Sequence, residues 1–224
     1  MKRKKILLIC GIVALCISAC SVTKNNSGDS TSAVNTEDET EGKTIKIDGL
    51  SFDGNTIKFI NEETKFLDDA IGMNYTILIK NIEMSSEIKG DETCWQKEIG
   101  MEDAEEKEGQ LINGKIIYID FVVTNNLDNN YDFYTSTIGL MGVYDGEVRP
   151  LSESPNYCNL MGEGKDAFKV TLQPGEEKNI QVGYYVCSED IESTDIYVDP
   201  SSGTLYDSYK TFYSIPGVSS IQKE

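Results

Sequence analysis

The most regular pattern in the chain lies at residues 115–124, and it limits the fold more than any other stretch. Every second side chain there is apolar, at Ile117, Ile119, Phe121 and Val123. A two-residue period is typical of a β-strand. Weaker alternation recurs at residues 74–83, 133–144, 167–172, 180–186, 196–198 and 205–213, with turn pairs such as Pro174-Gly175 between the runs. Many short strands separated by turns predict an all-β protein, an antiparallel immunoglobulin-like β-sandwich.

The segment before this pattern predicts a small extension at residues 44–114. Residues 44–52 and 56–60 alternate on either side of Asp53-Gly54-Asn55, which favours a β-hairpin. Residues 61–72 place apolar side chains at helical spacing, between a capping Asn61 and Gly72, and predict a short helix. A strand follows at 74–83, then a long polar stretch at 85–113 whose charged part, 101–108, is suited to an exposed helical turn. Connections of such length tend to be functional.

The first nineteen residues have the layout of a secretory signal. Lys2, Arg3, Lys4 and Lys5 precede an uncharged apolar run at residues 6–19. A helix needs roughly 20 apolar residues to cross a bilayer, so this run is too short for a permanent span. Cys10 and Cys16 lie inside the run and leave with it.

The end of that run, Ile17-Ser18-Ala19-Cys20, resembles the lipobox of bacterial lipoproteins. The resemblance implies cleavage between Ala19 and Cys20 and a diacylglycerol on the Cys20 thiol. The mature protein would then be anchored by lipid on the outer face of the cytoplasmic membrane. The alternative is an ordinary cleaved signal that leaves Cys20 as a free thiol. Residues 20–43 are polar and acidic beyond the cysteine and predict a disordered tether.

The charge balance excludes several classes of function. The chain has 20 basic and 38 acidic residues, a net charge of −18, and no histidine. Nucleic-acid binding depends largely on neutralising phosphates, so no nucleic-acid partner is expected. The lack of histidine excludes the usual serine and cysteine hydrolase triads and histidine zinc sites.

Two segments carry a resemblance to a known family. The strand at residues 116–126 ends in Thr124-Asn125-Asn126, and residues 170–176 read Val-Thr-Leu-Gln-Pro-Gly-Glu. Together they resemble the immunoglobulin-like domains of uncharacterised lipoproteins from Firmicutes and related bacteria. The resemblance covers about half the chain and implies a sandwich core at residues 115–224. It implies nothing about activity.

Three cysteines, Cys94, Cys158 and Cys187, lie beyond the signal. In an oxidising space outside the cytoplasm two of them can form a disulfide, and three pairings are open. Without histidine none of them has the base that a catalytic cysteine needs.

No catalytic residue, metal ion or cofactor is predicted. Asp128, Asn130 and Asp132 have the spacing at which calcium loops begin, but Phe133 and Gly139 stand where an EF-hand needs glycine and a carboxylate. We interpret these residues as turn formers. Paired carboxylates such as Glu105-Glu106 lack the apolar surroundings of a glycosidase acid.

These observations favour a non-enzymatic binding module for another envelope protein or an envelope polymer. The binding surface is expected in residues 85–113, or in loops at 125–132 and 156–165. Two alternatives stay open: a cell-envelope hydrolase that uses carboxylates or calcium, and a passive spacer or assembly subunit.

Overall fold

The fold is described from a computed structural model of the chain. It describes residues 45–47, 50–52, 56–68, 71–98, 100–144, 147–152, 154–201 and 211–223. The predicted signal, the lipidation site at Cys20 and the tether lie outside these residues. Residues 41–224 cluster as one compact unit.

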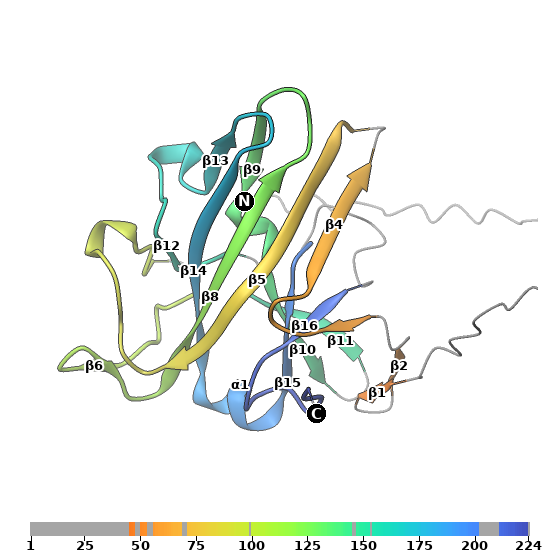
Figure 1. The fold of residues 1–224 in the computed structure, drawn as a ribbon. Helices are drawn as coiled ribbons and strands as arrows, with labels where there is room; N and C mark the ends of the chain where they lie inside the picture. The colour runs from red at the N-terminus through yellow and green to blue at the C-terminus, as the bar shows by residue number, and fades with distance from the viewer. Residues whose placement is uncertain are drawn as a thin grey trace, which may run out of the picture. The chain divides into compact units, whose positions relative to one another are not determined.

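The first of two five-stranded sheets contains the longest strands and is antiparallel throughout. Its order across the sheet is β12 (Tyr157–Cys158), β14 (Glu177–Cys187), β8 (Gly114–Asn125), β5 (Met73–Ser85) and β4 (Glu63–Asp68) (Figure 1). The strand at residues 115–124 is therefore the central strand of this sheet, and its pairing with β14 runs from Gly114 to Thr124.

The second sheet is shorter and mixed. Its order is β11 (Glu147–Ser152), β10 (Gly139–Tyr144), β15 (Asp195–Asp199), β16 (Phe212–Ser214) and β3 (Ile57–Lys58). The β16–β3 pair is parallel and the other pairs are antiparallel. Three two-stranded ribbons complete the strands: β1 (Ile45–Ile47) with β2 (Leu50–Phe52), β6 (Glu106–Lys107) with β7 (Gln110–Leu111), and β9 (Tyr131–Tyr134) with β13 (Lys169–Leu172).

Helical structure is limited to short segments in the described residues. The α-helix α1 (Ser188–Ser193) follows β14, and three 3₁₀ turns are η1 (Glu92–Cys94), η2 (Thr135–Thr137) and η3 (Gly164–Asp166).

One hydrophobic core lies between the two sheets. It joins inward side chains of the first sheet, such as Ile77, Ile119 and Val182, to Leu140, Ile196 and Tyr213 of the second. Each of these six side chains is fully buried. The alternating faces of β5, β8 and β14 supply most of this core because the second sheet covers one face. The predicted class, an all-β antiparallel sandwich, is confirmed.

The predicted hairpin between residues 44–52 and 56–60 is wrong. β1 pairs with β2 inside the first segment, with Ile47 opposite Leu50, and the sequence between these two residues is Asp48-Gly49. Asp-Gly is as strong a hairpin signal as the Asp53-Gly54 pair that guided the prediction. β3, from the second segment, pairs instead with β16, more than 150 residues away.

The short helix predicted at residues 61–72 is also wrong, because this segment contains β4. Thr64 and Phe66 are buried, whereas Leu67 and Ile71 are 64% exposed. Burial therefore follows a two-residue period, and pairing with β5 runs from Glu63 to Asp68. Asn61 does not cap a helix; it sits in a turn with a φ of 68° and donates its N–H to the carbonyl of Ile79 at 2.7 Å.

The extension expected at residues 44–114 is not separate from the sandwich. β5 lies between β8 and β4 in the first sheet, and β3 closes one edge of the second. Residues 101–108 contain turns and the start of a β-ribbon rather than a helical turn. Of the strand predicted at 205–213, residues 205–210 lie outside the described residues, and the strand that the structure describes is β16.

Candidate functional site

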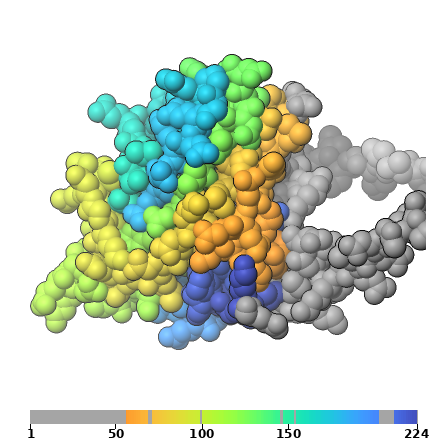
Figure 2. All heavy atoms as spheres, viewed as in Figure 1, coloured from red at the N-terminus to blue at the C-terminus, as the bar shows by residue number. Residues whose placement is uncertain are grey.

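The polar segment at residues 85–113 folds into a defined structure beside the first sheet (Figure 1). Its two ends pair: Leu111 N–H donates to the carbonyl of Ser86 at 2.8 Å, and Glu87 forms a β-bridge with Gln110. The β6–β7 ribbon turns through Glu108 and Gly109, both with positive φ. We call residues 85–113 the excursion. In Figure 2 its yellow to yellow-green atoms form one flank of the visible face.

A second small core holds the excursion against the face of the first sheet that points away from the sandwich interior. The sheet contributes Ile116, Tyr118 and Tyr157, and the excursion contributes Met101 and Leu111. All five are buried. Ile117 and Ile119 of the same strand point into the main core, so β8 is covered on both faces. The excursion is therefore part of the fold and not a loose loop.

Tyr118 fixes the start of the excursion through its hydroxyl. The phenol oxygen accepts the N–H of Lys89 at 2.7 Å and donates to the carbonyl of Glu87 at 3.1 Å. Burial raises the pKa of this tyrosine to about 12, partly offset by the bond from Lys89. Two backbone groups of the excursion thus depend on one side chain from the central strand.

Trp95, the single tryptophan of the chain, is held by a hydrogen bond, two ring contacts and a backbone bridge. Its indole N–H donates to the carbonyl of Lys89 at 3.0 Å. Its ring centroid lies 5.0 Å from that of Tyr157 and 6.3 Å from that of Tyr118, the latter edge to face. Its backbone forms an antiparallel bridge with Tyr157. These contacts fix the ring orientation while leaving Trp95 partly exposed.

Gly90 permits this close packing. Its φ is +89°, and a Cβ added there would lie 2.5 Å from the Tyr157 ring. Both the backbone conformation and the space therefore require glycine. The next residue, Asp91, caps η1: its carboxylate accepts the N–H of Thr93 at 2.9 Å and the hydroxyl of Thr93 at 2.7 Å. These hydrogen bonds lower the pKa of Asp91.

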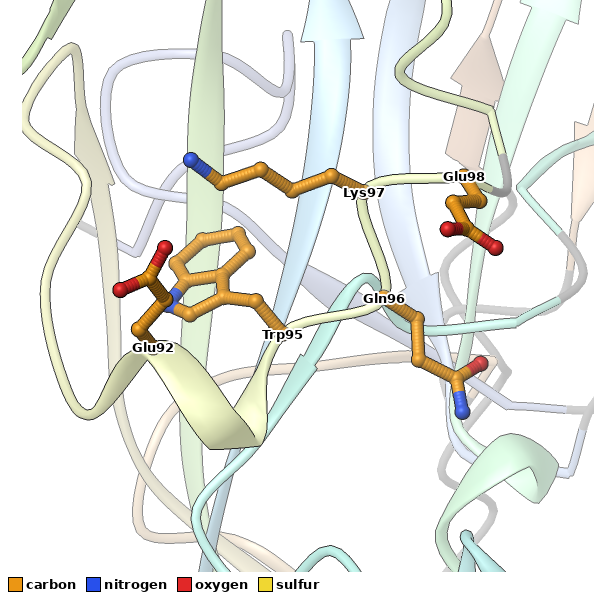
Figure 3. A pocket seen from close by; sticks show the side chains of 5 residues that line it. All are labelled: Glu92, Trp95, Gln96, Lys97 and Glu98. Carbon is orange, nitrogen blue, oxygen red and sulfur yellow. The ribbon is translucent and has the colours of Figure 1, made fainter. Parts of the chain in front are cut away.

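A surface hollow of about 580 Å³ opens beside Trp95. Its lining consists of Glu92, Trp95, Gln96, Lys97 and Glu98. In Figure 3 the Glu92 carboxylate lies next to the indole, Lys97 extends past it, and Gln96 and Glu98 lie on the other side. We call this the Trp95 pocket. Its aromatic wall comes from a ring that is already fixed by β8 and β12, which limits the entropy lost on binding.

The side chains that line the pocket carry more negative than positive charge. The Lys97 ammonium pairs with the Glu106 carboxylate at 3.3 Å. Within the described residues Glu92 and Glu98 have no ion-pair partner. The excursion as a whole contains nine acidic and three basic residues. An aromatic face flanked by unpaired carboxylates is suited to a cationic group.

The other predicted loops have structural roles. The carboxylate of Asp132 accepts the hydroxyl of Thr171 at 2.6 Å and lies 3.8 Å from the Lys169 ammonium. The carbonyl of Asn129 accepts the side-chain amide of Asn125 at 2.8 Å. Among the described residues no group of three or more histidine, cysteine or acidic side chains could hold a metal ion. The loop at 156–165 begins with Asn156, whose side-chain oxygen accepts the N–H of Tyr185 at 2.7 Å.

The three cysteines occupy different surroundings and are free thiols in the structure. Cys158 is fully buried in the main core. Cys94 is partly buried and ends η1 next to Trp95. The Cys187 thiol ends β14 and donates to the Asp190 carboxylate at 3.1 Å.

The sequence predicts a binding surface in residues 85–113 but does not single out Trp95, which lines the pocket there. The available signal was a lone tryptophan inside a strongly charged stretch, where a large aromatic side chain has no local apolar partners. Its actual partners, Tyr118 and Tyr157, come from distant strands.

These features define an all-β sandwich protein with an aromatic, acidic surface pocket. Across the described ranges no helix is long and apolar enough to cross a membrane. No protein-family model and no curated protein matches the chain.

Two solved structures resemble this chain. One is an uncharacterized β-sandwich protein from Clostridium difficile 630, with 16% identity and a TM-score of 0.37 over 71% of this chain and 93% of that chain. The other is a functionally unknown protein from Listeria monocytogenes EGD-e, with 13% identity and a TM-score of 0.37 over 62% of this chain and 71% of that one.

Proposed function

We propose that the protein is a lipid-anchored lipoprotein outside the cytoplasm whose sandwich is a non-enzymatic binding module. The anchor rests on the basic start, the short apolar run and the lipobox-like Ile17-Ser18-Ala19-Cys20. Thioether-linked diacylglycerol on Cys20 supplies two acyl chains, and two chains hold a protein stably on a bilayer where one is marginal.

Cys20→Ser in the full chain tests the anchor. The wild-type protein should incorporate an alkyne-labelled fatty acid and sediment with membranes, whereas the Cys20→Ser protein should do neither. Cys16→Ser is the matched control, because it changes a cysteine four residues earlier and leaves the lipobox intact. Equal labelling of the wild type and the Cys20→Ser protein would contradict the anchor and leave the binding module untouched.

The binding function is carried by one observation: a preorganised tryptophan forms the wall of a pocket lined by two unpaired carboxylates. The ligand that fits is a cationic group presented by a protein or an envelope polymer, such as a lysine ammonium. A cation over a tryptophan face contributes about 0.5–1 kcal/mol at an exposed site. Each exposed carboxylate adds about 0.2–1 kcal/mol, so a single cation binds weakly and several linked cations bind more firmly.

Trp95 fluorescence measures this binding directly, because the chain has no other tryptophan. We expect saturable changes in emission with pentalysine and none with its fully acetylated counterpart, which has the same backbone without the charges. Chitin oligosaccharides serve as a neutral polymer probe. Saturation by the oligosaccharide but not by pentalysine would support a binding module and contradict the proposal that its ligand is cationic.

The charge of the whole protein attracts any polycation, so a matched variant is needed. Glu92→Gln with Glu98→Gln removes two charges from the pocket and should weaken pentalysine binding by about fivefold. Glu189→Gln with Glu192→Gln removes two charges from exposed positions on α1 and should change the affinity by less than about twofold. Equal losses in the two double variants would show nonspecific attraction and contradict the pocket.

A further inference from the structure

A β-bridge between the excursion and β12 brings two cysteines near each other. Trp95 and Tyr157 form an antiparallel bridge, and Gln96 N–H donates to the carbonyl of Asn156 at 2.6 Å. In an antiparallel pair, one step back on one strand lies opposite one step forward on the other. Cys94, the last residue of the 3₁₀ turn η1, and Cys158 both adjoin this bridge on the side away from Gln96.

This placement suits a disulfide. Bridged residues such as Trp95 and Tyr157 have Cα atoms about 4.5–5.5 Å apart, and Cys94 and Cys158 are their immediate neighbours in the chain. Disulfides span Cα separations of roughly 4.4–6.8 Å. The pair lies at the end of β12, the edge strand of the first sheet, where η1 brings the excursion alongside. The two thiols also interact: burial raises the pKa of Cys158, and the charge of a Cys94 thiolate adds to the rise.

Cys187 is too far along the sheet to compete for Cys158. Cys158 pairs across the strands with Val182 of β14. Cys187 lies five residues further along the same strand, which is about 17 Å at 3.4 Å per residue. Its thiol already has a partner in the carboxylate of Asp190. Bridging these two cysteines would require the sheet to come apart.

We propose that oxidation joins Cys94 to Cys158 and leaves Cys187 as a thiol, so that the Trp95 pocket is covalently fastened to the sandwich core. All three thiols are free in the structure, so this link would be a new bond. The link would close a loop of 63 intervening residues and hold Trp95 next to Tyr157 at the point where they already meet.

The reaction needs an external disulfide as oxidant, such as oxidised glutathione or the disulfide of an envelope oxidoreductase. Cys94, the more exposed thiol, loses its proton to solvent and attacks one sulfur of the oxidant, which forms a mixed disulfide and releases a thiolate. Cys158 then loses its proton and attacks the Cys94 sulfur, which releases the second thiolate. The protein loses two electrons and two protons, and the oxidant is reduced to two thiols.

Mass mapping of the full chain tests the pairing without any substitution. After treatment with oxidised glutathione, free thiols are blocked with iodoacetamide and the unreduced protein is digested with trypsin. The three cysteines fall on separate tryptic peptides, residues 90–97, 116–165 and 179–210. We expect the first two peptides to be joined, to separate on reduction, and the third to be alkylated. A link to residues 179–210, or three alkylated cysteines, would overturn the proposal.

Variants give a second readout. Cys187→Ser should keep the joined peptides, and Cys94→Ser should lose them while keeping the circular dichroism spectrum of the wild type. Oxidation should raise the melting temperature by about 5–15 °C in the wild type and in Cys187→Ser. In the Cys94→Ser protein, oxidation should leave the melting temperature unchanged. A rise in Cys94→Ser equal to that of the wild type would contradict the assignment.

Discussion

The side-chain amide of Asn125 donates to the carbonyl oxygen of Leu172 across 3.2 Å, and both residues are fully buried. The same amide donates to the carbonyls of Gln173 and Asn129 at 3.0 and 2.8 Å. The backbone of Asn125 pairs with Gly175 and Glu176 at 3.0 Å each. The Thr-Asn end of β8 and the Leu-Gln-Pro-Gly-Glu turn therefore form one hydrogen-bonded unit.

Asn125→Ala should lower the free energy of unfolding by about 2–4 kcal/mol, because it leaves buried carbonyl groups without donors. Asn125→Asp should be at least as damaging, since it replaces the donors with a buried acceptor that faces three carbonyls. Urea denaturation measures both losses. Asn130→Ala, in the exposed part of the same loop, is the control and should cost less than about 0.5 kcal/mol. A similar small loss at Asn125 would show that the unit does not depend on this side chain.

Phe66 and Leu67 distinguish the observed strand β4 from the helix that their spacing suggested. Phe66 is 8% exposed and stacks on Tyr75 with ring centroids 4.9 Å apart, whereas Leu67 is 64% exposed. Phe66→Ala should lower the free energy of unfolding by about 3–4 kcal/mol, and Leu67→Ala should lower it by less than about 0.5 kcal/mol. Chemical denaturation measures both changes. Comparable losses at the two neighbouring positions would mean that both side chains are buried, as on the apolar face of a helix.

Tyr118→Phe tests how the excursion is fastened. The change leaves the ring in the second core and removes the hydroxyl that bonds Glu87 and Lys89. We expect a loss of about 1–2 kcal/mol and a red shift of Trp95 emission, because the carbonyl of Lys89 also orients the indole. Tyr134→Phe, at a tyrosine that is 45% exposed, is the control. Unchanged emission in Tyr118→Phe would mean that the aromatic contacts alone hold Trp95.

The sequence predicts the long strands well, for a physical reason. β8 and β14 each bury one face against the second sheet, so their inward positions must be apolar at every second residue. β5 keeps the same period as far as Ile79, where a register shift before Asn81 interrupts it. The sequence does not predict β4, because Thr64 and Phe66 are its only buried residues. The exposed Leu67 and Ile71 add apolar residues at the spacing expected of a helix. The local sequence around β3 does not reveal its partner, because β3 pairs with β16 near the other end of the chain.

The candidate site is only partly visible in the sequence. The length and charge of residues 85–113 predict a functional segment, but nothing local indicates that it folds onto the sheet. That outcome depends on Tyr118 and Ile116, which occupy the outward positions of β8 and give this strand a second apolar face. The role of Trp95 follows only when these outward residues and Tyr157 are brought together.

Asp199 gives the sandwich a dependence on pH that can be isolated by one substitution. Its carboxyl group is 1% exposed, and burial raises its pKa to about 6, although the N–H and hydroxyl of Ser201 donate to it at 2.8 Å each. An aspartate in the unfolded chain has a pKa of about 3.9. Since the folded pKa is the higher one, the folded state binds more protons between these values. The contribution of Asp199 to the free energy of unfolding is therefore complete below about pH 4. It is lost as the pH rises through about 6, and the loss amounts to about 2–3 kcal/mol.

Asp199→Asn tests this dependence, because the asparagine cannot ionise and keeps an oxygen for Ser201. Relative to the wild type, its unfolding free energy should rise by that amount between pH 4 and pH 7 in urea titrations. A difference between the two proteins that stays constant over this range would show that Asp199 does not titrate with a raised pKa.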